Sequence, residues 1–337
     1  MRALVLKKPG DATVEIIPEP VRRPDQVLLK VRNVGLCGTD LNSFRGKNPL
    51  VTYPRVLGHE IGATVVEANG LRPDLTAGAH VAVSPYSRCG SCPSCRRGRP
   101  NACQFCQTMG VMRDGGLTEF IQAPAEDVFP AKLSVSELCI VEPLSIGFHA
   151  AARGRVTAGD TVAVIGCGGV GLGAVAGAAF RGARVIAVDV ESEKLEVARK
   201  AGATNLIDST SETWKQHLDE LTNGQGPDVV IEAVGRPETF RAAVELVAFT
   251  GRVVYIGYAK EDVAYETRLF VQKELEILGS RNAVADDFRE VIQMLEQKRF
   301  PLADYITEVV PLESTAEMLH RWSDCPRDFT KIIVSLD

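Results

Sequence analysis

Residues 161–189 read TVAVIGCGGVGLGAVAGAAFRGARVIAVD, and this stretch decides the fold of the second half of the chain. The apolar, β-branched run Val162–Ile165 predicts a strand that is buried on both faces. A helix of small residues follows at Gly169–Arg181, and a second buried strand, Arg184–Val188, leads to Asp189. The turn between strand and helix matches G-x-G-x-x-G through three glycines: Gly166, Gly168 and Gly171. Strand, glycine turn, helix, strand and acid in this order predict a dinucleotide-binding unit.

Each glycine of this loop has a mechanical role in such a unit. Gly166 is expected to form the tight turn, and Gly168 to let the backbone approach a pyrophosphate. Gly171 is expected to let helix and strand pack closely, while the N–H groups of Gly169 and Val170 face the phosphates. The glycine pattern alone is weak evidence, because turns and close packing also favour glycine.

Asp189 lies eighteen residues after Gly171. A carboxylate there would accept hydrogen bonds from both ribose hydroxyls and would repel a 2′-phosphate. The residues that follow are Val-Glu-Ser rather than arginine, which favours NAD over NADP. Lys194 is a candidate for contact with the adenine, or else a solvated lysine on a helix surface.

Length and composition limit the classes of protein that the chain can be. With 337 residues, it is expected to form two domains, and 45% hydrophobic and 24% charged residues are ordinary for a soluble globular protein. A net charge of −5 gives no general attraction to nucleic acid or to an anionic membrane. No apolar run reaches the roughly 18 residues of a membrane-spanning helix, and no export signal follows Met1. We therefore expect a cytoplasmic protein whose partners are small molecules.

The N-terminal part of the chain has the pattern of an all-β domain. Short strand-like runs alternate with Pro/Gly turns and long loops, which favours an antiparallel barrel or sandwich. The expected strands are Arg2–Leu6, Thr13–Ile17, Gln26–Val34, Glu60–Glu67, His80–Val83 and Thr118–Gln122. Residues 124–138 are expected to be polar loop, and a helix begins near Ser145.

Beyond the glycine loop, strand and helix patterns alternate as far as residue 278, which predicts a doubly wound parallel sheet. Helix Ala285–Gln297 and the strand-like run Lys331–Leu336 are expected to return to the β domain. The predicted fold is thus α/β, with a β domain at 1–147 plus 285–337 and a Rossmann domain at 148–284.

Three residues in separate segments are candidate ligands of a catalytic metal: Cys37, His59 and Glu142. A thiolate, an imidazole and a carboxylate can hold zinc and leave the fourth position open for water or substrate. Each also has a structural interpretation. Cys37 fits a small buried residue, His59 a hydrogen-bonded core histidine, and Glu142 an acid at the start of a helix.

A loop with four thiols is a more specific signal. Its cysteines follow one another at spacings of 3, 3 and 8: Cys89, Cys92, Cys95 and Cys103. Such short spacings suit a structural zinc that is coordinated by four sulfurs and has no open position. Part of the thiolate charge is expected to be offset by neighbouring arginines: Arg88, Arg96, Arg97 and Arg99. Disulfides and contact with nucleic acid are the alternatives, and Cys106 lies outside the spacing.

Five more motifs are distributed along the chain: GLCGTD (35–40), LGHE (57–60), VEPLSIGFHA (141–150), DVVIEAVG (228–235) and KELEILGSRNA (273–283). Together with the two loops, they resemble the zinc-dependent medium-chain dehydrogenase/reductase (alcohol dehydrogenase) family over essentially the whole chain. The resemblance implies a GroES-like antiparallel β catalytic domain beside the Rossmann domain.

The same resemblance implies roles for individual residues. Cys37 and His59 would bind the catalytic zinc with Glu142 or Glu60 as third protein ligand, and the two glutamates would be able to exchange during turnover. Thr39 would take the proton of the substrate, although residues 40–44 lack the histidine that often continues this relay. Val234 is implied to contact the cofactor.

The resemblance also implies an activity. Glu142 in an EPL motif is typical of sorbitol, threonine and sugar-acid dehydrogenases, and GSRNA is most similar to dehydrogenases of hexonates such as L-galactonate or L-gulonate. Arg281 and Asn282 are then candidates for holding a carboxylate or hydroxyls, or else Arg281 pairs with an acid or faces solvent. A secondary alcohol would give hydride to NAD in a cleft between the domains, with two zinc ions per chain.

Other interpretations stay open at this point. A threonine or sorbitol dehydrogenase is the alternative within the family. A non-enzymatic NAD-binding protein would lack the zinc chemistry, and a zinc-free quinone-type reductase would lack the four-thiol loop. The family also implies a homodimer or homotetramer, for which we expect contacts at residues 251–258.

Overall fold

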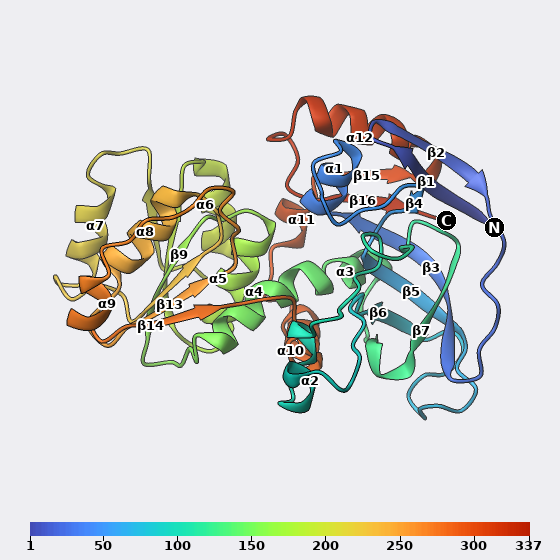
Figure 1. The fold of residues 1–337 in the computed structure, drawn as a ribbon, viewed down its shortest axis with the longest axis horizontal. Helices are drawn as coiled ribbons and strands as arrows, with labels where there is room; N and C mark the ends of the chain where they lie inside the picture. The colour runs from blue at the N-terminus through green and yellow to red at the C-terminus, as the bar shows by residue number, and fades with distance from the viewer. The chain divides into compact units, whose positions relative to one another are not determined.

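The computed structural model describes all residues from 1 to 337, and the chain divides into two compact units. The first unit comprises residues 1–142, 284–296 and 302–337, and the second comprises residues 143–283 and 297–301. Figure 1 shows the strands of each unit and the position of both termini in the first unit. No helix has the length and apolar character needed to cross a membrane.

The first unit is built mainly from strands. Its strands are β1 (Arg2–Lys8), β2 (Asp11–Ile16), β3 (Gln26–Leu36), β4 (Arg55–Val56), β5 (Glu60–Glu67), β6 (His80–Val83), β7 (Phe120–Pro124), β8 (Val128–Pro130), β15 (Glu308–Pro311) and β16 (Ile332–Ser335). Its helices are α1 (Gly38–Phe44), α2 (Pro93–Arg96), η1 (Pro100–Ala102), η2 (Ala125–Asp127), α3 (Val135–Cys139), α10 (Ala285–Glu296), α11 (Leu302–Tyr305), η3 (Leu312–Ser314) and α12 (Thr315–Asp324).

Strand β3 is the centre of the seven-stranded sheet in this unit. It pairs antiparallel with β5, β7 and β16, so segments from both ends of the chain meet on it. The prediction that the C-terminal strand rejoins the β domain is confirmed, because Val334 of β16 pairs with Val34 of β3. The sheet is not wholly antiparallel as predicted, since β15 runs parallel to β16.

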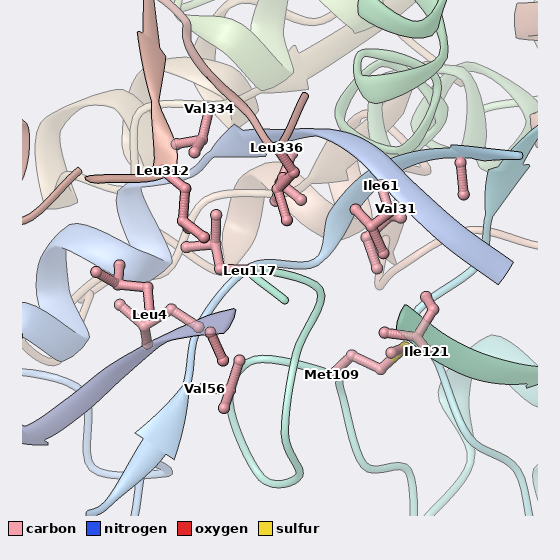
Figure 2. Close-up of a cluster of buried hydrophobic side chains, with 14 of the residues drawn as sticks. Leu4, Val31, Val56, Ile61, Met109, Leu117, Ile121, Leu312, Val334 and Leu336 are labelled. Atoms are coloured by element: carbon pink, nitrogen blue, oxygen red, sulfur yellow. The ribbon is translucent and has the colours of Figure 1, made fainter. Parts of the chain in front are cut away.

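The core of this unit lies among apolar side chains that these strands contribute (Figure 2). Leu4 on β1, Leu29 on β3 and Leu117 before β7 are fully buried. Leu312 and Val334, from the C-terminal segment, lie in the same cluster. Burial of such side chains stabilises each by roughly 1.5–3 kcal/mol, which keeps the C-terminal segment on the β domain.

Several elements of the first unit were not predicted. Residues 124–138 are expected to be loop, but β8 lies within this range and α3 begins in it. In the motif at 35–40, the first two residues are the end of β3, and α1 starts at Gly38. Helix α3 carries a signal that a sequence can show: the Ser134 hydroxyl accepts from the Glu137 N–H at 3.3 Å, and the Glu137 carboxylate accepts from the Ser134 N–H at 2.8 Å. Strand β8 has only three residues, too few for a period-2 pattern to be recognised.

The second unit is an alternation of strands and helices. Its strands are β9 (Thr161–Ile165), β10 (Arg184–Asp189), β11 (Asn205–Asp208), β12 (Val229–Glu232), β13 (Arg252–Tyr255) and β14 (Glu276–Gly279). Its helices are α4 (Val141–Arg153, which begins in the first unit), α5 (Gly169–Phe180), α6 (Ser192–Lys200), α7 (Trp214–Leu221), α8 (Pro237–Leu246) and α9 (Arg268–Gln272).

All six strands are parallel, in the order β11-β10-β9-β12-β13-β14. From β9 the chain adds strands on one side, and from β12 it adds them on the other, so the order reverses between β9 and β12. This is the predicted doubly wound sheet, and ligands bind at the carboxyl ends of the strands where the order reverses. Strand β13 lies inside the sheet, between β12 and β14, and the expected self-association through residues 251–258 stays a prediction.

Small residues bring α4 and α5 unusually close together. A Cβ atom on Gly147 would collide with the backbone at Gly173 and Ala174, and one on Gly177 would lie 3.0 Å from the Cα atom of Phe148. The glycines of α5 are therefore needed for helix packing as well as for the loop that precedes it.

Candidate functional site

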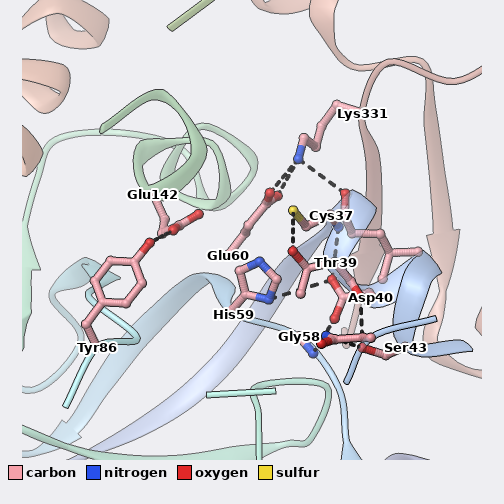
Figure 3. A network of polar contacts seen from close by, with 12 residues as sticks. Cys37, Thr39, Asp40, Ser43, Gly58, His59, Glu60, Tyr86, Glu142 and Lys331 are labelled. Atoms are coloured by element: carbon pink, nitrogen blue, oxygen red, sulfur yellow. Dashed lines mark hydrogen bonds and ion pairs between the residues drawn. The ribbon is translucent and has the colours of Figure 1, made fainter. Parts of the chain in front are cut away.

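The candidate catalytic site lies where β3 ends and β5 begins (Figure 3). Cys37 follows the last residue of β3 and is the N-cap of α1, while Glu60 is the first residue of β5. The register of the β3–β5 pair places Gly35 opposite Glu60, and a Cβ atom on Gly35 would collide with the Glu60 carboxylate. Glycine at position 35 therefore leaves the space that Glu60 occupies.

Cys37, His59 and Glu60 each direct one donor atom into this space. Their Sγ, imidazole N and carboxylate O atoms all lie within 4.8 Å of one another. Ligands about 2.0–2.3 Å from a zinc ion are separated by distances in this range, so the donor set fits zinc with an open fourth position. In addition, the buried Nδ1 atom of His59 has no hydrogen-bond partner.

Asp40 lies behind His59 and was not singled out by the sequence. Its carboxylate is fully buried, accepts hydrogen bonds from Cys37 N–H at 2.9 Å and Gly58 N–H at 3.2 Å, and has Oδ2 3.8 Å from His59 Nδ1. Burial alone lowers the pKa of His59, but the charges of Asp40 and Cys37 raise it well above its ordinary value. At 3.8 Å this contact is electrostatic rather than a hydrogen bond, in agreement with the unpartnered Nδ1 atom.

Glu60 has a buried cation as its partner. Lys331 Nζ lies 2.6 Å from both oxygens of Glu60 and also donates to the Leu36 carbonyl at 3.2 Å. Burial opposes the charged form of Lys331, but Glu60 keeps the pKa of Lys331 above its ordinary value. The sequence alone predicts only that a strand begins at residue 331.

Glu142 is held in a different way. It is buried in the first turn of α4 and accepts a hydrogen bond from the Tyr86 hydroxyl, and it does not belong to the close group of three donors. Burial raises the pKa of Glu142 to about 7. Of the two glutamates named for the third ligand, only Glu60 lies with Cys37 and His59, and the part of Glu142 stays a prediction.

Thr39, the residue expected to take the substrate's proton, is in the first turn of α1 and partly exposed. Its Oγ1 atom lies 3.7 Å from Cys37 Sγ. The hydroxyl is therefore beside the donor cluster and can reach both the cluster and solvent.

The four-thiol loop forms a second, separate cluster. The sulfurs of its cysteines all lie within 4.8 Å of one another: Cys89, Cys92, Cys95 and Cys103. Cys103 Sγ is 3.6 Å from Cys89 Sγ and 3.8 Å from Cys92 Sγ. A tetrahedron with zinc–sulfur bonds of about 2.3 Å has edges of about 3.8 Å, so the cluster fits zinc.

Backbone N–H groups complete this cluster. Cys92 N–H donates to Cys89 Sγ at 3.3 Å, and Phe105 N–H donates to Cys103 Sγ at 3.3 Å. All nine cysteines are free thiols, and Cys106 is buried outside the group. The geometry favours one four-sulfur site over two disulfides.

Two of the arginines beside this loop have partners other than the thiolates. Arg88 forms ion pairs with Asp127 at 2.7 Å and Glu126 at 2.6 Å, so its charge is balanced by carboxylates. Arg96 donates to the Ser91 carbonyl and so ties the loop together. Arg88 thus links this loop to η2.

The glycine loop has the geometry expected of a dinucleotide cradle. Gly166 has φ of +95°, and a Cβ atom there would lie 2.6 Å from Val234 Cγ2. A Cβ atom on Gly171 would collide with the Gly166 carbonyl, whereas one on Gly168 would meet open space. Gly166 and Gly171 are thus required by packing, and Gly168 faces the space where a pyrophosphate would lie.

Asp189 connects the end of β10 to this loop. Its Oδ2 atom accepts from Cys167 N–H at 2.5 Å, and its Oδ1 atom accepts from Val190 N–H at 2.8 Å. Lys194 forms an ion pair with Glu191 at 2.8 Å. These contacts hold Asp189 at the carboxyl end of the sheet, where a ribose would be bound.

Arg281 and Asn282 lie between β14 and α10, in the second unit, whereas the zinc donors are in the first. Arg281 is exposed, and Asn282 has a left-handed backbone with φ of +51°. Their part in substrate binding stays a prediction.

Comparison with known proteins agrees with this geometry. A family model described as "Alcohol dehydrogenase GroES-like domain" matches residues 23–133, and one described as "Zinc-binding dehydrogenase" matches residues 169–297. The chain is 35% identical to an uncharacterized zinc-type alcohol dehydrogenase-like protein of Haemophilus influenzae, covering 98% of each. It is 32% identical to an L-galactonate-5-dehydrogenase of Escherichia coli K12, and the match covers 95% of each protein. It is also 32% identical to a sorbitol dehydrogenase of Bacillus subtilis, and that match covers 99% of this chain and 97% of the relative.

Solved structures share the fold along the whole chain. A short chain alcohol dehydrogenase from Escherichia coli CFT073, in complex with NADH, has a TM-score of 0.91 at 28% identity and covers 100% of this chain and 99% of its own. A putative zinc-binding dehydrogenase from Sinorhizobium meliloti, bound to NADP, has a TM-score of 0.89 at 30% identity and covers 99% of this chain and 98% of its own.

Proposed function

Because the chain belongs to the zinc-dependent medium-chain alcohol dehydrogenase family, we propose that it transfers a hydride from a secondary alcohol of a polyol or sugar acid to NAD. The observation that carries this proposal is the donor cluster of Cys37, His59 and Glu60, with Thr39 beside it. A protein that only bound the dinucleotide would have no need of this cluster.

Cys37, His59 and either Glu60 or Glu142 would hold the catalytic zinc, and the four cysteines of residues 89–103 the structural one. When bound, zinc supplies a Lewis acid that lowers the pKa of a substrate hydroxyl. The Asp40 carboxylate would attract the His59 ring electrostatically from 3.8 Å. The Thr39 hydroxyl would accept the proton of the substrate while it donates its own proton towards solvent, which the partial exposure of Thr39 permits.

Lys331 and Tyr86 hold the two competing carboxylates. The cation Lys331 pairs with Glu60 inside the donor cluster. Glu142 instead accepts a hydrogen bond from the Tyr86 hydroxyl, which carries no charge. In this proposal Glu60 and Glu142 would be alternative third ligands of the zinc, and Lys331 and Tyr86 are their hydrogen-bond donors within the protein.

For the substrate we propose a hexonate such as L-galactonate or L-gulonate. The GSRNA segment and the similarity to an L-galactonate-5-dehydrogenase support this choice. Arg281 would pair with the carboxylate, and Asn282 would bind hydroxyls. A sorbitol-type or threonine dehydrogenase is the alternative, supported by relatives with those names.

The experiment is a substrate panel. The purified, zinc-loaded protein is incubated with NAD and with aldonic acids, neutral polyols or threonine, and NADH formation is followed by absorbance. We expect the highest kcat/KM with a hexonate, and Arg281→Ala is expected to raise KM for the hexonate but not for sorbitol. Activity restricted to sorbitol or threonine would favour the alternative, and no activity with any alcohol would contradict the proposal.

We also propose that the chain forms a homodimer or homotetramer. Strand β14 supports this, since it is an edge of the six-stranded sheet and its Ile277 side chain is exposed. Val271, in α9 just before it, is also exposed. Sedimentation of the wild type and of Ile277→Lys tests this: the wild type should be larger than a monomer and the variant smaller than the wild type.

A further inference from the structure

Glu232 is a buried carboxylate that the proposed chemistry does not use. It is the last residue of β12, at the carboxyl end of the sheet, and it is fully buried. Its neighbours across the sheet are Ile165 of β9 and Tyr255 of β13. Glu232 thus lies beside the position where the strand order reverses.

One oxygen of Glu232 organises the turn that follows it. Oε1 accepts hydrogen bonds from Val234 N–H at 2.9 Å, Gly235 N–H at 2.7 Å and the Thr239 hydroxyl at 2.7 Å. Thr239 lies in the first turn of α8. A single carboxylate oxygen therefore fixes the 233–235 turn and the start of the next helix through three hydrogen bonds.

That turn is in contact with the glycine loop. A Cβ atom on Gly166 would lie 2.6 Å from Val234 Cγ2, and one on Gly171 would lie 3.5 Å from Ala233 Cβ. The Ala233 N–H also donates to the Ile165 carbonyl at 2.9 Å. Any movement of the 233–235 turn would therefore be transmitted to the loop that cradles the pyrophosphate.

The other oxygen of Glu232 is confined by a third segment. Oε2 is buried without a hydrogen-bond partner, and a Cβ atom on Gly257 would lie 2.5 Å from it. The same Cβ atom would lie 2.5 Å from the Gly235 nitrogen. Glycine is thus required at position 257 to leave room for the Glu232 carboxylate.

The sheet order indicates which half of the dinucleotide this turn would contact. Asp189, the expected ribose acceptor, ends β10 on one side of β9, and Glu232 ends β12 on the other side. With the pyrophosphate at the glycine loop, the adenosine half lies on the β10 side and the nicotinamide half on the β12 side.

We propose that Glu232 is a positioning residue for the cofactor: it holds Val234 against the glycine loop and so shapes the nicotinamide half of the site. This rests on the cofactor binding proposed above. Glu232 itself does not contact the dinucleotide, because it is buried below the turn.

The test compares NADH with AMP, which fills only the adenosine half. In Glu232→Ala we expect the Kd for NADH to rise about tenfold, equivalent to about 1.4 kcal/mol, while the Kd for AMP changes less than about twofold. Glu232→Gln keeps an acceptor oxygen for the two N–H groups, so it should recover most of the NADH affinity. NADH fluorescence and calorimetry measure both ligands.

Asp160→Ala is the matched control. Asp160 also caps a turn, accepting from Thr157 N–H at 2.7 Å and Thr157 Oγ1 at 2.9 Å, but it precedes β9 at the opposite end of the sheet. It should lower thermal stability without a change in the Kd for NADH. If Glu232→Ala does not fold, Thr239→Val, which removes one of three donors, should raise the Kd for NADH by about threefold.

Unchanged NADH affinity in Glu232→Ala, or in Thr239→Val, would overturn the inference, and so would equal loss of NADH and AMP binding. These results differ from failure of the proposed function, in which the wild-type protein itself would not bind NADH.

Discussion

Lys331 Nζ lies 2.6 Å from both carboxylate oxygens of Glu60, although 271 positions separate the two residues in the chain. Both side chains are buried, and Glu60 is one of the three donors of the candidate zinc site. Strand pairing accounts for the contact: β16 and β5 both pair with β3, and Lys331 immediately precedes β16. The C-terminal segment of the chain therefore supplies the counter-charge of the catalytic site.

Removal of Lys331 should leave an uncompensated buried charge. We expect Lys331→Met to lower the free energy of unfolding by about 3–5 kcal/mol, as is usual when one partner of a buried pair is lost. Urea denaturation after chelation of zinc measures this, because a bound zinc ion would itself balance the charge of Glu60. The double variant Glu60→Gln/Lys331→Met should recover most of the loss, and a double variant as unstable as the single one would show that the pair is not the cause.

Removal of Cys37 should abolish catalysis and leave the cofactor site intact. Cys37→Ala is expected to lower kcat at least about 10³-fold, to reduce the zinc content from two ions per chain to one, and to leave the Kd for NADH unchanged, because activation of the hydroxyl depends on the metal. Cys325→Ala, at an exposed thiol, is the control and should keep two zinc ions. Full dehydrogenase activity in Cys37→Ala would refute the assignment.

The four-thiol cluster should govern stability rather than chemistry. Cys103→Ser is expected to remove the structural zinc and lower Tm, because a closed four-sulfur site contributes its binding energy to folding. Cys106→Ser changes a buried thiol three residues away and should keep both metals. Elemental analysis and thermal unfolding measure the two effects, and loss of a zinc ion from Cys106→Ser would mean that the ligand set is wrong.

Asp189 should set the preference between NAD and NADP. In Asp189→Ala we expect kcat/KM for NAD to fall by about 10–100-fold, because the carboxylate accepts hydrogen bonds from the ribose. The ratio of kcat/KM for NAD to kcat/KM for NADP should fall further, because the carboxylate also repels a 2′-phosphate. The variant also loses the hydrogen bond to Cys167 N–H, so Tm must be recorded beside the kinetics. Wild-type activity that is higher with NADP would contradict the predicted preference.

Glu142 should make the metal-free protein less stable as pH rises. Its pKa is raised by burial from 4.5 to about 7, so the folded state binds a proton that the unfolded state releases. The linkage therefore lowers the free energy of unfolding between about pH 4.5 and pH 7, with a slope of at most about 1.4 kcal/mol per pH unit. Urea denaturation after chelation measures the slope. Glu142→Gln should reduce it, and an equal slope in that variant would mean that other groups cause it.

Local patterns predicted part of the fold well. The glycine loop and Asp189 lie as expected at the carboxyl end of a parallel sheet, because strand, turn and helix signals there are contiguous in sequence. Helix α3 was missed although Ser134 and Glu137 form a capping box, a signal that sequence reasoning can use. Strands β8 and β15 have three and four residues, and their place in the sheet depends on partners elsewhere in the chain.

The sequence by itself determined the chemistry of the ligands and their order: four thiols at knuckle spacing, a thiol, an imidazole and two carboxylates, and three glycines before an acid. These are properties of residue types and of short spacings, which a chain carries whether or not it is folded. Only the tertiary structure decided that Glu60 lies with Cys37 and His59, that Tyr86 holds Glu142, and that Lys331 neutralises Glu60. The register of β3 with β5 and with β16 sets those contacts, and register depends on burial of side chains from segments far apart in the chain.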